Sequence, residues 1–146
     1  MNGINIKNTV LALFAAIGSM FTGWLGGWDV FMKALVMFMV MDYITGIAVA
    51  FLFNNSGKTK NGGLSSVECY KGIVKKMCIL ALVGVSVAVD NLSGTDFVRS
   101  ATVFFFLGNE GLSIIENVGL MGLEYPEFIK KALEIFKEQS DKKGEM

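Results

Sequence analysis

The stretch VMFMVMDYITGIAVAFLF, Val36 to Phe53, carries one aspartate inside an otherwise uncharged apolar run. Asp42 lies near its middle, where an acid in a membrane helix costs about 2.5–3.5 kcal/mol on insertion scales. Residues three, four and eight positions after Asp42 share its face of a helix, and these are Thr45, Gly46 and Ala50. The stretch therefore predicts a membrane helix whose polar, small-residue face packs on other helices, within one subunit or between subunits.

The composition of the whole chain extends this apolar character. Of its 146 residues, 53% are hydrophobic and only 18% are charged, which predicts lipid as the solvent. A formal net charge of zero argues against a nucleic-acid partner held by phosphate contacts. The chain has no histidine, and its two cysteines lack the spacing of a zinc site. We therefore expect no enzyme, cofactor or metal site, and interpret Cys78 as an apolar helix residue and Cys69 as a loop thiol.

Four segments approach the roughly 20 residues that a membrane-spanning helix needs. They run over residues 8–25, 30–53, 73–89 and 98–118. The sequence thus predicts an all-α integral membrane protein with three to four transmembrane helices plus a C-terminal amphipathic helix. The expected divisions are an N-terminal apolar segment 1–29, a membrane domain 30–121 with a cytoplasmic loop 54–72, and a cytoplasmic amphipathic tail 122–146.

The distribution of lysines predicts the orientation. Lysines crowd the 54–76 region and the tail, whereas the opposite side carries only Lys33 and Arg99. The positive-inside rule then places the loop and the C-terminus in the cytoplasm. The residues that determine this topology are Lys58, Lys60, Lys71, Lys75, Lys76, Lys130 and Lys131.

Two segments leave alternatives open. The first, rich in alanine and glycine, fits a spanning helix, a helix lying along the interface, or a cleaved signal peptide. In the tail, apolar residues recur at three- and four-residue spacing after Pro126, which predicts an amphipathic helix: Phe128, Ile129, Ala132, Leu133 and Phe136. That helix fits the membrane surface, a pairing with its own copy, or packing on its own loop.

Polar and small residues recur on the other membrane segments. The last segment carries a polar face of Asn109, Glu110, Ser113, Glu116 and Asn117. The residues expected to serve helix packing or oligomerisation are Asp42, Tyr43, Thr45, Gly46, Ala50, Gly84 and Ala88. Asp42 and Glu110 fit two interpretations: paired or protonated packing residues, and residues that line an aqueous path or drive assembly.

Three motifs carry a family resemblance. MDYITGIAVA, YKGIVKKMCILALVGVSVAVDNLSG and RSATVFFFLGNEGLSIIENVGLMGL occur in this order. With their spacing, they resemble the toxin-secretion/phage-lysis holin family of clostridial and other Firmicutes phages, from about Trp28 to Phe136. The matching positions are Asp42, Tyr43, Thr45, Gly46, Lys71, Gly72, Lys75, Lys76, Arg99, Asn109, Glu110, Gly111, Ser113, Glu116 and Asn117.

The resemblance implies a bacteriophage homo-oligomer in the bacterial host cytoplasmic membrane, in contact with lipid. It implies lesions that open at a timed moment of host cell lysis and let an endolysin or a secreted toxin cross, with no catalytic residue. A second hypothesis is a small ion-conducting channel or transporter in which Asp42 and Glu110 bind a cation or proton. A third is a membrane anchor whose tail recruits a soluble partner.

Overall fold

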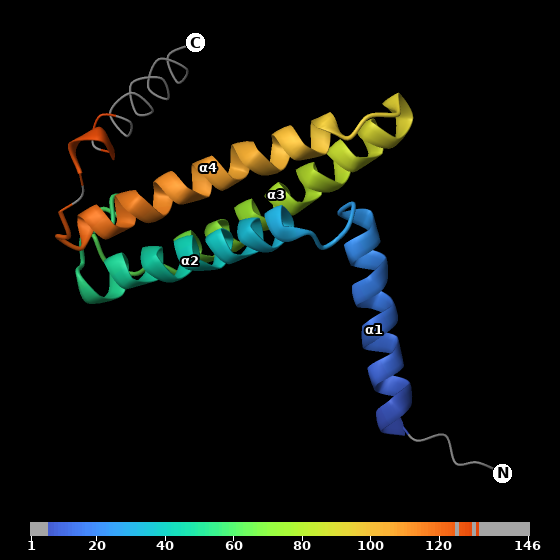
Figure 1. Ribbon diagram of the computed structural model, residues 1–146. Helices are drawn as coiled ribbons and strands as arrows, with labels where there is room; N and C mark the ends of the chain where they lie inside the picture. Colours follow the sequence, from blue (N-terminus) through green and yellow to red (C-terminus); the bar gives the residue numbers. More distant parts are fainter. Residues whose placement is uncertain (1–5, 125, 130, 132–146) are drawn as a thin grey trace.

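The computed structural model describes residues 6–124, 126–129 and 131, and its long elements are four helices (Figure 1). In chain order they are α1 (Ile6–Trp24), α2 (Val30–Leu52), α3 (Ser66–Ser93) and α4 (Phe97–Leu120). The described residues contain no strand, so the predicted all-α fold is confirmed. Most of the predicted amphipathic tail helix, including Lys130, lies outside the described residues.

The helices α1, α2 and α3 are long and apolar enough to cross a membrane. The helix α4 does not meet the same criterion of composition, because it carries charged and amide residues along one side. The helix α3 begins at Ser66 rather than at the predicted Ile73, with Glu68 favourably placed in its first turn. Cys69 therefore lies in a helix, so its prediction as a loop thiol is wrong, and the link before α3 shortens to residues 53–65.

The helices α2, α3 and α4 lie side by side as a bundle, with α4 packed along both of the others (Figure 1). Met32, Leu35 and Met39 recur at three- and four-residue spacing and form the buried face of α2. With residues of the other helices they form the apolar core, which consists of Leu25, Met32, Leu35, Met39, Ile79, Val83 and Val103. This core fills the half of the bundle nearer to α1.

The helix α1 leaves the bundle and runs across its long axis, and none of its residues is buried (Figure 1). Gly26 and Gly27, with φ of +74° and +105°, provide the turn that separates it from α2. Its last residue packs closely on α3: a Cβ on Gly84 would lie 2.3 Å from Cζ2 of Trp24. Two small residues of α3 were predicted to serve helix packing or oligomerisation. Of these, Gly84 is covered by the chain's own Trp24, while Ala88 is exposed.

Arg99 holds the link between α1 and α2 against the start of α4. Its Nε donates to the carbonyl oxygen of Leu25 (2.8 Å), its Nη2 donates to that of Gly27 (3.3 Å), and its Nη1 pairs with Oδ2 of Asp29 (2.7 Å). Burial tends to raise the pKa of Asp29, but the Met32 N–H and the Arg99 guanidinium outweigh it and hold this pKa below its ordinary value. Asp29 is therefore ionised at neutral pH and caps α2 while it pairs with Arg99.

Asp90, near the end of α3, caps the following helix from outside. Its Oδ1 accepts from the hydroxyl of Thr95 (2.6 Å) and the N–H of Val98 (3.0 Å), and its Oδ2 accepts from the N–H of Arg99 (2.7 Å). The residue at the usual cap position, Asp96, makes no such side-chain bond. Asp90 thus satisfies the free N–H groups of the first turn of α4 and joins α3 to α4.

We predict that Asp90→Asn destabilises the bundle by about 1–3 kcal/mol, because the amide offers one acceptor oxygen where the carboxylate offers two. Thermal unfolding of the full chain in detergent measures the loss. The matched control is Asp96→Asn, whose side chain caps nothing and whose unfolding should stay within about 0.5 kcal/mol of the parent. Equal unfolding curves for the two variants would contradict the cap assigned to Asp90.

Candidate functional site

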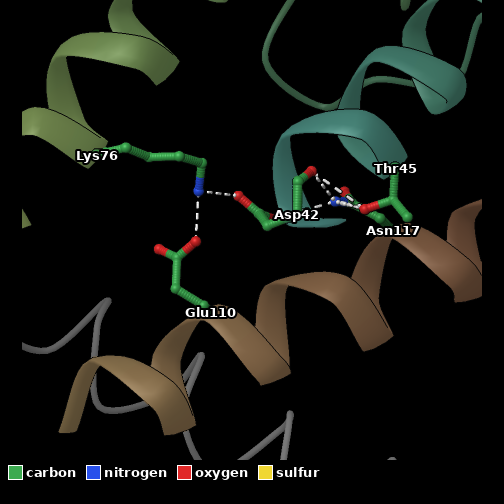
Figure 2. A network of polar contacts seen from close by, with 5 residues as sticks. All are labelled: Asp42, Thr45, Lys76, Glu110 and Asn117. Carbon is green, nitrogen blue, oxygen red and sulfur yellow. Dashed lines mark hydrogen bonds and ion pairs between the residues drawn. The ribbon is translucent and has the colours of Figure 1, made fainter. Parts of the chain in front are cut away.

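Three buried or half-buried charges meet where the polar face of α2 contacts the other two helices. Lys76 of α3 lies between Asp42 of α2 and Glu110 of α4 (Figure 2). Its Nζ is 2.8 Å from Oδ2 of Asp42 and also donates to Oε2 of Glu110. The side chains of Lys76, Asp42 and Glu110 are only 15%, 14% and 6% exposed. We call these three residues the ion triad.

An amide extends the ion triad along the same contact between α2 and α4 (Figure 2). Nδ2 of Asn117 lies within hydrogen-bond distance of two oxygens of Asp42, the side-chain Oδ1 (3.2 Å) and the backbone carbonyl oxygen (3.3 Å). It also lies 2.9 Å from Oγ1 of Thr45. Gly46 lies under this amide, since a Cβ there would be 3.7 Å from Nδ2. The polar, small-residue face of α2 therefore packs against α4 of the same chain.

The pairing explains why an acid is tolerated within this apolar run. A buried charge is costly unless an opposite charge and hydrogen bonds compensate it. Lys76 compensates both carboxylates, and Asn117 donates to the second oxygen of Asp42. Among the residues that the structure describes, no buried polar side-chain atom lacks a partner. The polar residues thus act together as a specific lock between three helices.

A cleft of about 270 Å³ runs from the 53–65 link to the ion triad. Its lining includes Asp42, Lys76 and Glu110, the polar Asn109 and Ser113 of α4, and Ser56, Lys58 and Thr59 of the link. The apolar core lies on the other side of the ion triad, toward α1, because its residues precede Asp42 and Glu110 and follow Lys76. The triad is therefore accessible from one end of the bundle and sealed from the other.

The structure brings together only some of the predicted residues. Asp42, Thr45, Gly46, Glu110 and Asn117 meet at the site, whereas Asn109 is exposed at the cleft and Glu116 is half-buried away from its lining. Tyr43 packs over Gly72, and Phe38 over Gly111. Ala50 is buried, and Lys58, Lys60, Lys71, Lys75 and Lys131 are exposed.

Lys76 is the functional residue whose role sequence reasoning missed, because it was named only as a marker of topology and as a position that matches the family. The spacing of Lys76 indicates that it faces inward. Ile79 and Val83 follow it by three and seven residues, so all three lie on one face of α3. Ile79 and Val83 are buried, so Lys76 heads the inward face, whereas the adjacent Lys75 is exposed. This contrast between neighbouring lysines identifies the counter-ion.

We predict that Lys76→Gln destabilises the bundle by about 3–5 kcal/mol, because it leaves two carboxylates without their shared counter-ion. The amount of protein that accumulates in membranes and its thermal unfolding measure the effect. Combining Lys76→Gln with Asp42→Asn and Glu110→Gln should restore most of the loss. Lys75→Gln is the matched control, since Lys75 is exposed and has no ion-pair partner among the described residues. A loss equal to that of Lys76→Gln would refute the triad's role.

Comparison with known proteins identifies the family. The profile of the bacteriophage holin family matches residues 19–138. An uncharacterized protein of Listeria innocua is 38% identical over 94% of this chain and 90% of its own length. An uncharacterized 14.9 kDa protein in the nagH 3' region of Clostridium perfringens is 34% identical over 88% of this chain and 93% of its own length. A probable holin of Bacillus phage phi105 is 31% identical, over 79% and 80%. No solved structure matches the chain. With its apolar helices, the chain is a membrane protein and belongs to the bacteriophage holin family.

Proposed function

We propose that this holin oligomerises in the bacterial cytoplasmic membrane and opens lesions through which an endolysin or a secreted toxin crosses at a timed moment of host lysis. The observation that supports this most is the closed bundle itself: a charged interior, reached by a cleft from one end and sealed by the apolar core from the other. Such a protomer is watertight while closed and already contains the polar groups that a water-filled lesion requires. Its membership of the holin family and its similarity to a probable holin support the same role.

The outer faces of the helices provide surfaces for association. Met37, Val40 and Ile44 of α2 are 57%, 51% and 54% exposed. In a bilayer these side chains contact lipid or a second copy, and both contacts keep water out. Accumulated copies therefore stay closed in the proposed mechanism until the bundles separate and expose the ion triad. The holin family is non-enzymatic, so we assign no catalytic step, cofactor or metal to this chain.

We further propose that α4 crosses the membrane with α2 and α3, because it packs along them and its polar residues Glu110 and Asn117 are buried. The proposed orientation places the 53–65 link and the C-terminus in the cytoplasm. Lys58 and Lys60 lie in that link and are exposed, as the positive-inside rule favours. At the opposite end, Arg99 is neutralised by Asp29, which reduces the competing charge.

The two natural cysteines test this orientation. Cys69 lines the cleft, whereas Cys78 is exposed on the surface of α3. We predict that a membrane-impermeant maleimide modifies Cys69 in the Cys78→Ser variant only after the inner membrane is permeabilised. Cys78 in the Cys69→Ser variant should stay unmodified, because lipid covers it. If the reagent modifies Cys69 while the inner membrane is still intact, the orientation is opposite to the one proposed.

Cargo size tests the proposed lesion against the channel hypothesis, which the accessible carboxylates Asp42 and Glu110 favour. We predict that induced expression in bacteria causes an abrupt loss of viability and releases a folded cytoplasmic reporter enzyme. Potassium efflux is measured in the same cultures, and a strain with the empty vector is the control. Efflux of ions without release of the enzyme would refute the lesion and support a small channel.

A further inference from the structure

We infer that α1 lies along the membrane surface at its end of the bundle, with one face in lipid and the other in water. This selects the interfacial state from the three that its sequence allows. The inference concerns the resting chain and does not depend on the proposed release of cargo. It is carried by the division of the helix surface, by the position of Trp24, and by the surroundings of the helix ends.

The surface of α1 divides into two faces of different chemistry. Large apolar side chains recur at three- and four-residue spacing along one face, which we call the bulky face: Val10, Leu13, Phe14, Ile17, Met20 and Phe21. Small or polar side chains predominate on the opposite, small face, with Leu11 at its edge: Asn8, Ala12, Ala15, Ser19, Thr22 and Gly23. All these residues except Thr22 are exposed, so the bundle covers neither face. A helix divided in this way is suited to a boundary between lipid and water.

Trp24 shows which face of α1 meets the bundle. It continues the bulky face, three positions after Phe21 and four after Met20. Its indole ring lies on Gly84, in the interior of α3 and away from the Ser93 end of that helix. The bulky face is therefore the one that continues, through Trp24, onto the apolar surface of α3. The helix α1 itself runs across the bundle axis (Figure 1).

The residues around both ends of α1 match this position. Trp24, Trp28 and Phe31 gather where α1 joins the bundle and are 48%, 45% and 49% exposed, as in an aromatic belt at the membrane interface. The bulky face is thus continuous with the lipid-facing surface of the bundle. Lys7, at the far end, is exposed, so its ammonium group can stay in water while its stem lies beside the apolar face. An exposed cation beside an apolar face is typical of a helix that rests on a lipid surface.

The turn before α2 prevents α1 from simply joining the bundle. Arg99 binds the backbone oxygens of Leu25 and Gly27, and the two glycines adopt their positive φ within this same turn. A Cβ on Gly26 would lie 2.7 Å from Nε of Arg99, so the turn and the guanidinium fit closely. The direction of α1 is therefore fixed by a packed, hydrogen-bonded turn.

Single cysteines on the two faces test the inference in the full chain, in a Cys69→Ser/Cys78→Ser background and before lysis begins. Ser19→Cys and Ala12→Cys report on the small face, and Ile17→Cys and Leu13→Cys report on the bulky face. Ile44→Cys, on the lipid-facing side of α2, is the reference for a protected position. A membrane-impermeant maleimide is applied to intact and to permeabilised cells, so that the comparison of faces holds for either orientation of the chain.

The expected result is that both small-face cysteines react at least about tenfold faster than both bulky-face cysteines, which react as slowly as Ile44→Cys. Four cysteines as slow as Ile44→Cys would show a spanning α1 and overturn the inference. A protected Ser19→Cys that forms a disulfide-linked dimer on oxidation would show a second copy on the small face instead. Four equally fast cysteines would show that no lipid covers the bulky face. The two positions on each face guard against a substitution that disturbs folding at one of them, and protection of Ile44→Cys verifies the bundle.

Discussion

The ammonium group of Lys76 is the contact on which the arrangement of the bundle depends. It joins a carboxylate of α2 to a carboxylate of α4 while it is itself carried by α3, so one cation ties three helices together. Because an unpaired charge is costly in a low-dielectric interior, the helices must turn these faces toward one another. That rotation directs Met32, Leu35 and Met39 into the apolar core and leaves side chains such as Met37 and Val40 for lipid. A polar contact therefore sets the orientation of the apolar surfaces.

The two ends of the bundle are held very differently. At the α1 end, Asp90 accepts three hydrogen bonds, two of them from N–H groups in the first turn of α4, and Arg99 binds the turn before α2. At the other end the cleft separates the helices. There, Nδ2 of Asn55 donates to the carbonyl oxygen of Leu120, the last residue of α4, at 3.0 Å. Local stability follows the density of packing and hydrogen bonding, so in the proposed mechanism we expect the cleft end to separate first. Water from that side then meets the ion triad before it meets the apolar core.

Much of this arrangement could be predicted from helical periodicity, and the parts that could not depend on contacts between distant residues. The face of Asp42, Thr45 and Gly46 follows from spacing alone, and the partner of that face is Asn117, one of the polar residues predicted for the last helix. Lys76 was missed because a lysine near a helix end indicates topology equally well, and only its register with Ile79 identifies it as buried. The cap by Asp90 requires the turn that returns the chain onto α3. The direction of α1 requires two positive φ values, which glycine permits but does not dictate.

The closed bundle also constrains how a lesion can form by association. The predicted polar faces are already occupied within one chain, since Asp42, Glu110 and Asn117 bind residues of the neighbouring helices. When closed bundles associate through their outer faces, apolar surfaces meet, and no polar surface is left to line a water-filled lesion. A water-filled lesion lined by these polar groups therefore requires α2, α3 and α4 to separate. Separation breaks the ion triad, but water that solvates the three charges removes the desolvation cost that their burial imposed. In the proposed mechanism, the same residues that lock the bundle in lipid are thus compatible with water once the cleft widens, which lowers the free-energy cost of opening.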